Sequence, residues 1–325
     1  MQADQEGFVG LNRRLFLASS AGALAAPALA CAAAPMRFTV ILDWFVNPDH
    51  APLFAAKYCG AYEKAGLDVK LIAPTDPDLP PRLVAAGKAD AALTYQTELY
   101  LLVDQGLPVR RTGTLINKPL TTLTALKRSG ITKLIELKGR KVGYSVAGVQ
   151  PVIIGAMLKH VGLSLHDVEL INVNFNLVSA LKTNQVDAVI GTYLTYEDIQ
   201  LAQEGLDPVV FLPTDYGVPT SDELILLSNV AGLKNPALPA FLGALKAGMA
   251  ALKADPDGML TAFLKDNPSL NDKLDIASWH ALPPYFDNSP AALNARQYEN
   301  YCDFLFKNGV IKRRFPLSDY AVAVA

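Results

Sequence analysis

The sequence predicts an α/β protein of two similar lobes, each a mainly parallel sheet covered by helices. Strand-like runs alternate with helix-like runs from Arg37 onward, which is typical of β-α-β units. A segment that begins at Lys88 is also echoed by a second one that begins at Gln185. Removal of an N-terminal signal would leave about 295 of the 325 residues, enough for two cores of ordinary size.

Residues 1–30 have the pattern of an export signal. Arg13 and Arg14 precede an uncharged run, rich in Ala and Leu, that ends in small residues at Ala30. The pattern fits a twin-arginine signal or an ordinary secretory signal, and the run is shorter than the roughly 20 residues that span a bilayer. We expect a periplasmic protein. A lipid anchor on Cys31 is the less favoured alternative, because the leucine of a lipoprotein motif is one residue out of place.

Composition excludes several classes of partner. The formal net charge is -2, and no basic stripe or run of like charges appears, so nucleic acid and anionic membrane are poor candidates. We expect a monomer without a cofactor, and the four histidines have no metal-ligand spacing. Cys59 and Cys302 could form one disulfide in an oxidising compartment or remain buried thiols.

The elements follow in order from the hydrophobic pattern. The alternation predicts a strand, a helix closed by Gly66, a strand, a loop rich in Pro and Asp, a helix, a strand and a helix. Without the loop, these strands and helices span, in order, residues 37–45, 50–66, 67–73, 82–88, 89–95 and 96–106.

The echo joins residues 88–109 to residues 185–209. Each copy has an Asp-Ala pair, a short apolar strand, a Tyr, an acidic residue and a helix stopped by Gly-Leu. Either two similar lobes or the chance recurrence of one βα unit accounts for it.

Aromatic and polar residues gather where the predicted strands end. Ligands bind beyond the carboxyl ends of strands in open parallel sheets, so we expect these residues as a set to line a cleft between the lobes, although core packing is the favoured interpretation for any one aromatic alone. They are Asp43, Trp44, Tyr95, Tyr144, Ser145, Tyr193, Tyr196 and Glu197.

Three stretches carry a resemblance to a known family. "LDWFVNPDHAPLFAA", "GTYLTYEDI" and "DYGVPTSDELIL" resemble the periplasmic solute-binding proteins that deliver the pyrimidine precursor of thiamin to an ABC importer, relatives of yeast thiamin pyrimidine synthase. The resemblance implies a type II periplasmic binding fold whose chain crosses between lobes near Leu126 and Leu226. Lobe one would then comprise residues 37–125 and 227–325, and lobe two residues 126–226. It also implies a small-molecule pyrimidine ligand and an ABC permease as partner.

Glu197, which the resemblance places in the cleft, is the first choice to bind the amidine-like edge of a 4-aminopyrimidine through two charge-assisted hydrogen bonds. The alternative is a solvated acid that favours the first turn of a helix. Trp44, Tyr95 and Tyr193 or Tyr196 could stack on the ring, each contact contributing about 0.5–1.5 kcal/mol.

The polar residues after the first strand have open roles. Asn47 could cap the following helix or contact ligand, whereas Asp49 is expected to cap it. Asp43 could contact ligand or hold a loop, and His50 could bind ligand or pack on Trp44.

Tyr144, Ser145 and Gly148 belong to a turn into a helix whose amide groups could bind a carbonyl oxygen or an anion. A plain turn from strand to helix explains the same residues.

Other functions are less favoured. The alternative ligands on this scaffold are riboflavin, which has stacking faces without an amidine edge, and an alkyl sulfonate, which needs cationic groups. We expect no enzyme: the yeast synthase uses pyridoxal phosphate on a lysine, and the context of Lys57, Lys64 and Lys70 singles out none of them.

Overall fold

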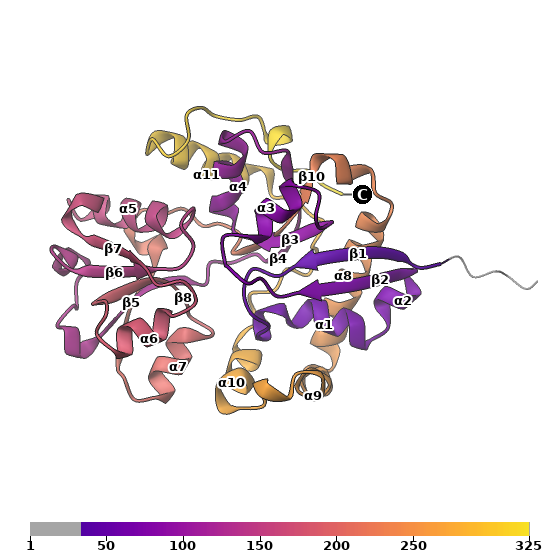
Figure 1. Cartoon of the computed structure of the whole chain (residues 1–325), viewed down its shortest axis with the longest axis horizontal. Helices are drawn as coiled ribbons and strands as arrows, with labels where there is room; N and C mark the ends of the chain where they lie inside the picture. Colours follow the sequence, from indigo (N-terminus) through magenta and orange to yellow (C-terminus); the bar gives the residue numbers. More distant parts are fainter. Residues whose placement is uncertain (1–33, 325) are drawn as a thin grey trace, which may run out of the picture. The chain divides into compact units, whose positions relative to one another are not determined.

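Two five-stranded mixed sheets organise residues 34–324, which are the residues that the computed structural model describes (Figure 1). The predicted signal and Cys31 lie outside them. In spatial order, the first sheet comprises β2 (Leu67–Ile72), β1 (Met36–Ile41), β3 (Ala91–Thr94), β10 (Leu224–Asn229) and β4 (Val109–Ile116). The second comprises β7 (Glu169–Asn172), β6 (Lys141–Tyr144), β8 (Ala188–Tyr193), β5 (Thr121–Leu126) and β9 (Pro208–Phe211).

The two sheets have the same internal plan. In each, the first three strands run parallel, and the fourth pairs antiparallel with both of its neighbours. The fold class predicted from the sequence is therefore confirmed, with one antiparallel strand in each sheet.

The echoed segments occupy equivalent places. Each supplies the middle strand of its sheet, β3 or β8, and the helix that follows. The paired acids also have equivalent contacts: Asp90 accepts a hydrogen bond from the Thr39 amide at 2.8 Å, and Asp187 accepts one from the Lys141 amide at 2.9 Å. The echo thus reflects two structurally similar lobes.

The chain crosses between the sheets earlier than expected. It leaves the first sheet after Ile116 and enters the second at Thr121, then returns between Phe211 and Leu224. The boundaries expected at Leu126 and Leu226 both fall inside strands, β5 and β10, and so require correction. Each of these strands follows a crossing, and its apolar sequence does not indicate which sheet it joins.

A buried carboxylate ties the two crossing segments together. Glu223, on the returning segment, accepts hydrogen bonds from the Leu120 amide at 2.5 Å, the Thr121 amide at 2.8 Å and the Thr121 hydroxyl at 2.7 Å. Hydrogen bonds to a charged group are stronger than neutral ones, so this contact fixes the spacing of the two connections.

Helices flank both sheets. The expected helix over residues 50–66 is interrupted at Gly60, whose φ of 69° ends the first segment. The α-helices are α1 (Ala51–Tyr58), α2 (Ala61–Lys64), α3 (Pro80–Ala85), α4 (Gln96–Asp104), α5 (Gln150–His160), α6 (Leu177–Lys182), α7 (Glu197–Gln203), α8 (Ala237–Ala254), α9 (Pro256–Asp266), α10 (Lys273–Ala281) and α11 (Ala295–Lys307). The 3-10 turns are η1 (Pro48–His50), η2 (Lys127–Ser129), η3 (Leu134–Leu137), η4 (Leu165–Asp167), η5 (Pro213–Tyr216), η6 (Val230–Lys234), η7 (Pro268–Leu270) and η8 (Leu317–Asp319).

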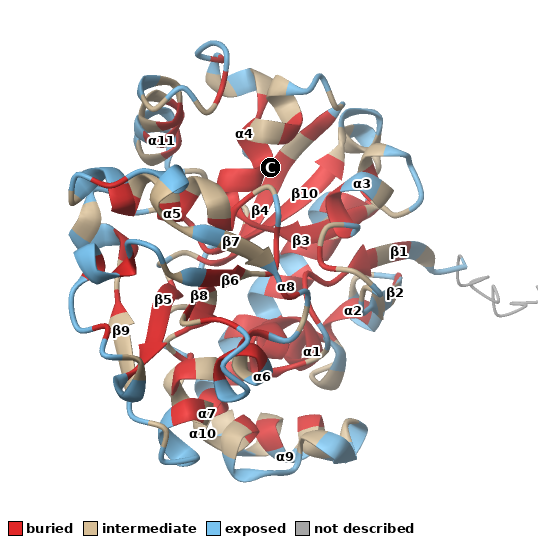
Figure 2. Cartoon of the chain, turned by 60° about the vertical axis from the view of Figure 1, so that its left-hand side comes forward, coloured by how far each residue is buried: buried red, intermediate tan, exposed pale blue. Residues whose placement is uncertain are grey.

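The inner strands β3, β10, β5 and β8 are largely buried, whereas the edge strands β2, β7 and β9 are partly exposed (Figure 2). In the first lobe, α8 packs closely on α1 at Gly248. A Cβ at this position would lie 2.6 Å from the backbone nitrogen of Ala56, so the absence of a side chain permits the close approach. Among the described residues, α8 alone is long and apolar enough to cross a membrane, yet half of it is buried within the protein. Cys59 and Cys302 are free thiols, so the disulfide alternative is wrong.

Candidate ligand site

A narrow pocket with a cavity volume of about 20 Å³ lies at the carboxyl ends of β1, β3 and β8. This is the edge where the strand-end argument places a ligand. Both sheets contribute to its wall. The lining residues are Asp43, Trp44, Asn47, Asp49, Tyr95, Gln150, Gly191, Tyr193 and Glu197.

Most, but not all, of the predicted ligand-binding residues line this pocket. Those that do are Asp43, Trp44, Asn47, Tyr95, Tyr193 and Glu197. Those outside its lining are His50, Tyr144, Ser145, Gly148 and Tyr196. Asp49, Gln150 and Gly191 line the pocket although the sequence did not predict them as ligand contacts.

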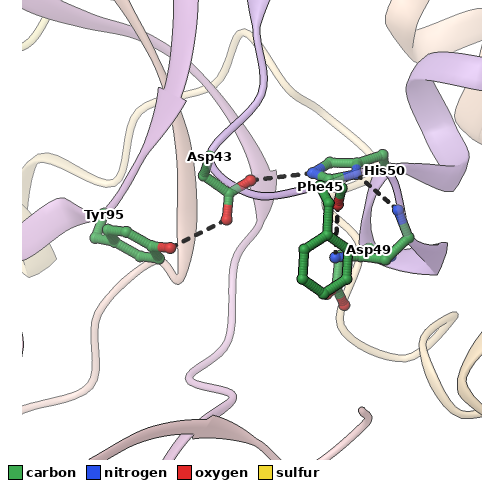
Figure 3. A network of polar contacts seen from close by, with 6 residues as sticks. Asp43, Phe45, Asp49, His50 and Tyr95 are labelled. Carbon is green, nitrogen blue, oxygen red and sulfur yellow. Dashed lines mark hydrogen bonds and ion pairs between the residues drawn. The ribbon is translucent and has the colours of Figure 1, made fainter. Parts of the chain in front are cut away.

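Asp43 is held from two sides in a buried hydrogen-bond chain (Figure 3). The Tyr95 hydroxyl donates to its Oδ2 at 3.1 Å, and Nε2 of His50 lies 3.0 Å from its Oδ1. The Asn47 amide donates to Nδ1 of His50 at 3.3 Å, so the neutral ring carries its proton on Nε2 and donates it to Asp43. His50 is thus placed behind Asp43, where it orients the carboxylate.

Asn47, not Asp49, caps the short helix η1. Its Oδ1 accepts from the Asp49 amide at 2.8 Å, which resolves the open choice for Asn47 in favour of a cap that also lines the pocket. The expectation that Asp49 caps the helix is wrong. Its carboxyl instead lines the pocket, where burial first, and then the charge of Asp43, raise its pKa well above the usual range.

Glu197 begins α7 directly above the end of β8. Its Oε2 accepts from the Tyr193 amide at 2.9 Å. The residue as a whole is half-buried, yet desolvation of the carboxyl raises its pKa to about 7, although the Tyr193 amide opposes the shift. Near neutral pH this carboxyl can therefore either accept hydrogen bonds as a carboxylate or donate one as an acid.

The predicted anion-binding turn is filled by the protein itself. Oε1 of Gln150 accepts from the Ser145 amide at 2.6 Å and the Val146 amide at 2.7 Å. Gly191 makes room for this side chain: its φ is 108°, and a Cβ there would lie 2.2 Å from Nε2 of Gln150. The amides that were expected to bind an anion or carbonyl oxygen are thus occupied.

The other residues of that turn also face the protein. Tyr144 packs half-buried against the main core, and the Ser145 hydroxyl donates to the Asn174 carbonyl. Gly148 faces the other lobe, where a Cβ would lie 3.7 Å from Oε1 of Glu98. Their side chains are therefore engaged away from the pocket lining.

Aromatic side chains close one side of the site. The Trp44 and Phe175 rings meet edge to face, with centroids 4.4 Å apart, and Phe45 is 6.4 Å from Tyr196. The Tyr196 hydroxyl donates to Asp275 of α10 at 3.3 Å, so this residue joins the lobes outside the pocket. Phe175, which follows β7, was not predicted, although its place after a strand end was a usable signal.

Three pocket residues carry buried polar atoms without a hydrogen-bond partner: Nε1 of Trp44, Oδ1 of Asp49 and the hydroxyl of Tyr193. Burial raises the pKa of the nearby Glu223 carboxyl, and the Tyr193 hydroxyl opposes that shift only weakly, without good hydrogen-bond geometry. Buried polar groups in proteins are normally paired, so these atoms are available to a polar ligand.

The charge of the lining is one-sided. Asp43, Asp49 and Glu197 contribute carboxyl groups, and no Lys, Arg or His is part of the lining. Such a wall suits a ligand that donates hydrogen bonds or carries positive charge. Among residues 34–324, no three acidic, imidazole or thiol groups are arranged as a metal site.

Two solved structures with a similar fold are sulfonate-binding proteins. An alkanesulfonate-binding protein of Xanthomonas axonopodis pv. citri superposes with a TM-score of 0.70 at 14% identity, covering 89% of this chain and 98% of its own. A periplasmic aliphatic sulphonate binding protein of Escherichia coli gives a TM-score of 0.67 at 17% identity, with coverages of 87% and 96%. At these identities the likeness concerns the fold alone.

Relatives by sequence have names that refer to thiamine biosynthesis or to an aminopyrimidine. A thiamine biosynthesis protein of Haemophilus influenzae is 43% identical over 289 residues, which are 89% of this chain and 92% of that protein. A formylaminopyrimidine-binding protein of Halalkalibacterium halodurans is 34% identical over 71% of each chain. A Saccharomyces cerevisiae 4-amino-5-hydroxymethyl-2-methylpyrimidine phosphate synthase is 28% identical over 78% of each chain. The family model described as NMT1/THI5 like matches residues 47–259, and the chain belongs to this family.

Proposed function

We propose that this protein is the periplasmic solute-binding component of an ABC importer and that it captures a thiamin pyrimidine precursor, hydroxymethyl- or formylaminomethyl-aminopyrimidine. The formylaminopyrimidine-binding relative supports the ligand class, and the fold of the solved neighbours supports a binding role. The export-signal pattern of residues 1–30 supports the location.

The observation that carries the proposal is a pocket lined by both aromatic rings and carboxyl groups. Trp44, Tyr95 and Tyr193 provide faces for a flat ring, and Glu197 provides the complement of an amidine edge. An aminopyrimidine presents an amino donor beside a ring nitrogen. The carboxyl of Glu197, whose pKa is about 7, can match that edge in two ways. As an acid it donates to the neutral ring nitrogen, and as a carboxylate it accepts from the protonated ring nitrogen; in both cases it accepts from the amino group.

Capture would proceed by closure of the two lobes. The pocket is lined from both sheets, and the lobes meet at Trp44 and Phe175 and at Tyr196 and Asp275. A ligand that contacts both lobes favours the closed state by the difference in its affinity for the two states. The closed form would then dock on the permease.

The same site argues against the competing ligands. An alkyl sulfonate would meet three carboxyl groups and no cation in the lining, and the turn amides that it would need are bound to Gln150. Riboflavin offers stacking faces but has no amidine-like edge for Glu197 to bind. A synthase-like activity on pyridoxal phosphate needs a lysine, and the lining contains none.

Thermal unfolding of the signal-free protein tests the proposal, with hydroxymethyl- and formylaminomethyl-aminopyrimidine, thiamin, riboflavin and taurine as separate additions. At about 100 times its dissociation constant a ligand adds roughly 2.7 kcal/mol, which raises the midpoint by a few degrees. We expect a shift with the pyrimidine precursors. A shift with riboflavin or taurine and none with a pyrimidine would overturn the proposed ligand.

A further inference from the structure

We propose that Asp49 and Trp44 form a second recognition point, which reads the substituent of the pyrimidine and selects a neutral group that is both a hydrogen-bond donor and an acceptor. This inference rests on the proposed function and deepens it. The chemical classes that fit are a hydroxyl and a formamide. A methyl group does not fit because it has no polar atom, and a phosphate ester does not fit because it is anionic.

Asp49 is unusual among the pocket residues because the protein does not use its carboxyl. The side chain is only 3% exposed, and its Oδ1 is buried without a hydrogen-bond partner. Asn47, and not Asp49, caps η1. His50 and Tyr95, and not Asp49, make the side-chain contacts of Asp43. A buried carboxyl without a partner costs about 1–3 kcal/mol, so its place in the pocket wall needs another explanation, and a ligand contact supplies one.

Trp44 supplies the complementary donor. Its Nε1 is buried and has no acceptor, while its ring is held edge to face against Phe175. The protein therefore fixes the direction of the indole N–H before any ligand arrives. Trp44 and Asp49 both belong to the segment that follows β1 and both line the same narrow pocket, which places them within reach of one ligand substituent.

The protonation of Asp49 widens what it can recognise. Burial first, and then the charge of Asp43, raise the pKa of Asp49 well above the usual range, which favours the protonated acid, a group that donates through O–H and accepts through C=O. A hydroxyl can exchange hydrogen bonds with this acid and accept from the indole N–H. A formamide can do the same with its N–H and carbonyl groups. A phosphate would bring negative charge beside Asp43 and Glu197, and the lining offers no cation to balance it.

Calorimetric titration with four ligands tests this selectivity: the hydroxymethyl, formylaminomethyl, methyl and phosphorylated hydroxymethyl forms of one 4-aminopyrimidine. For the wild type we expect the hydroxymethyl and formylaminomethyl forms to bind at least about tenfold more tightly than the methyl form, the scale of one to two net hydrogen bonds. The phosphorylated form should bind more weakly than the methyl form.

Two variants separate the inference from the proposed function. Asp49→Ala should bring the hydroxymethyl and methyl affinities to within about threefold of each other, mainly by weakening hydroxymethyl binding. Trp44→Phe, which keeps an aromatic ring but lacks the indole N–H, should also lower the ratio of hydroxymethyl affinity to methyl affinity. Glu197→Gln should weaken all four ligands by a similar factor. A wild-type ratio retained in Asp49→Ala would overturn the inference and leave pyrimidine capture standing, whereas no binding of any pyrimidine to the wild type would overturn both.

Folding of the variants is checked in the same series. Asp49→Leu is the second substitution, similar in shape to Asp but with no polar atom. Its thermal midpoint should not fall, because it replaces a buried acid that has no hydrogen-bond partner by an apolar group. If Asp49→Ala is unfolded, the ratio of hydroxymethyl to methyl affinity measured with Asp49→Leu decides the matter, and an unchanged ratio there counts against the inference.

Discussion

Nε2 of His50 lies 3.0 Å from Oδ1 of Asp43, and both side chains are buried beneath the candidate site. His50 also accepts the Asn47 amide, so one imidazole links the first turn of η1 to the carboxylate at the pocket wall. This arrangement gives His50 a supporting role.

Replacement of His50 by Ala should therefore reduce both stability and affinity. It leaves a cavity and removes a hydrogen bond to a buried carboxylate, and we expect a loss of about 2–4 kcal/mol in the free energy of unfolding. Urea denaturation measures this loss. His160→Ala is the control on an exposed histidine of the second lobe, and equal losses in the two variants would contradict the assigned role.

Glu197→Gln tests the contact with the amidine edge. The substitution keeps the shape of the side chain but removes the acid whose proton the ring would share, and affinity for the pyrimidine should fall by about 1.5–3 kcal/mol. Isothermal titration gives the value. Glu204→Gln, at the exposed other end of α7, is the matched control and should bind normally. Unchanged affinity in Glu197→Gln would remove this residue from the site.

Glu98 should make stability depend on pH. Its carboxyl is buried and accepts from the Thr94 hydroxyl at 2.5 Å, and burial raises its pKa to about 7 from 4.5. Because the folded pKa lies above the unfolded one, this stability is complete below about pH 4.5 and is lost as the pH rises through about 7. The expected loss is at most about 3 kcal/mol.

The variant Glu98→Gln isolates this contribution. Its free energy of unfolding should approach or exceed that of the wild type at pH 8 and should change less between pH 5 and pH 8. The carboxyls of Glu197 and Asp275 titrate in the same range, with pKa values of about 7, so the comparison is the difference between variant and wild type. Parallel curves for the two proteins would refute the assignment.

Much of the fold follows from local pattern. Alternating apolar periods predict β1 to β3 and α4 within a few residues, and the echo identifies two similar lobes because Asp90 and Asp187 recur with equivalent backbone contacts. The crossings were misplaced because the pairing of β5 and β10 is decided by contacts far along the chain. Local sequence carries no record of those contacts.

The site was predictable to the extent that strand ends mark it. Asp43, Trp44, Tyr95 and Tyr193 follow from that rule, since the carboxyl ends of parallel strands share one edge of a sheet. The sequence alone could not show which of Asn47 and Asp49 caps the helix. Either side chain can accept a hydrogen bond from a backbone N–H two residues further along the chain. Likewise, only the folded chain shows that Gln150 occupies the turn amides.

Gly191 should tolerate no side chain. Its φ of 108° is unfavourable for other residues, and a Cβ would collide with Gln150. Gly191→Ala should lower the free energy of unfolding by about 1–3 kcal/mol and weaken ligand binding, as chemical denaturation and titration would show. Gly148→Ala is the control, because a Cβ there meets only ordinary contacts. A Gly191→Ala protein as stable as Gly148→Ala would refute this account.

Phe175 should influence affinity from outside the pocket. It meets Trp44 across the two lobes, with ring centroids 4.4 Å apart, but is not part of the pocket lining. If ligand capture requires closure, Phe175→Ala should destabilise the closed state by about 0.5–1.5 kcal/mol, the scale of one aromatic pair. Affinity should then fall by roughly 2- to 12-fold, because apparent affinity depends on the fraction of closed protein.

The control for this prediction lies next to it. Phe45 is exposed by 41%, and its centroid is 6.2 Å from that of Phe175, so Phe45→Ala should have a smaller effect. Small-angle scattering of each variant, with and without pyrimidine, distinguishes loss of closure from loss of direct contact. Phe175→Ala should need more ligand to become compact, yet should reach the same compact state at saturation. Full affinity in Phe175→Ala would mean that the Trp44 contact accompanies closure without stabilising it.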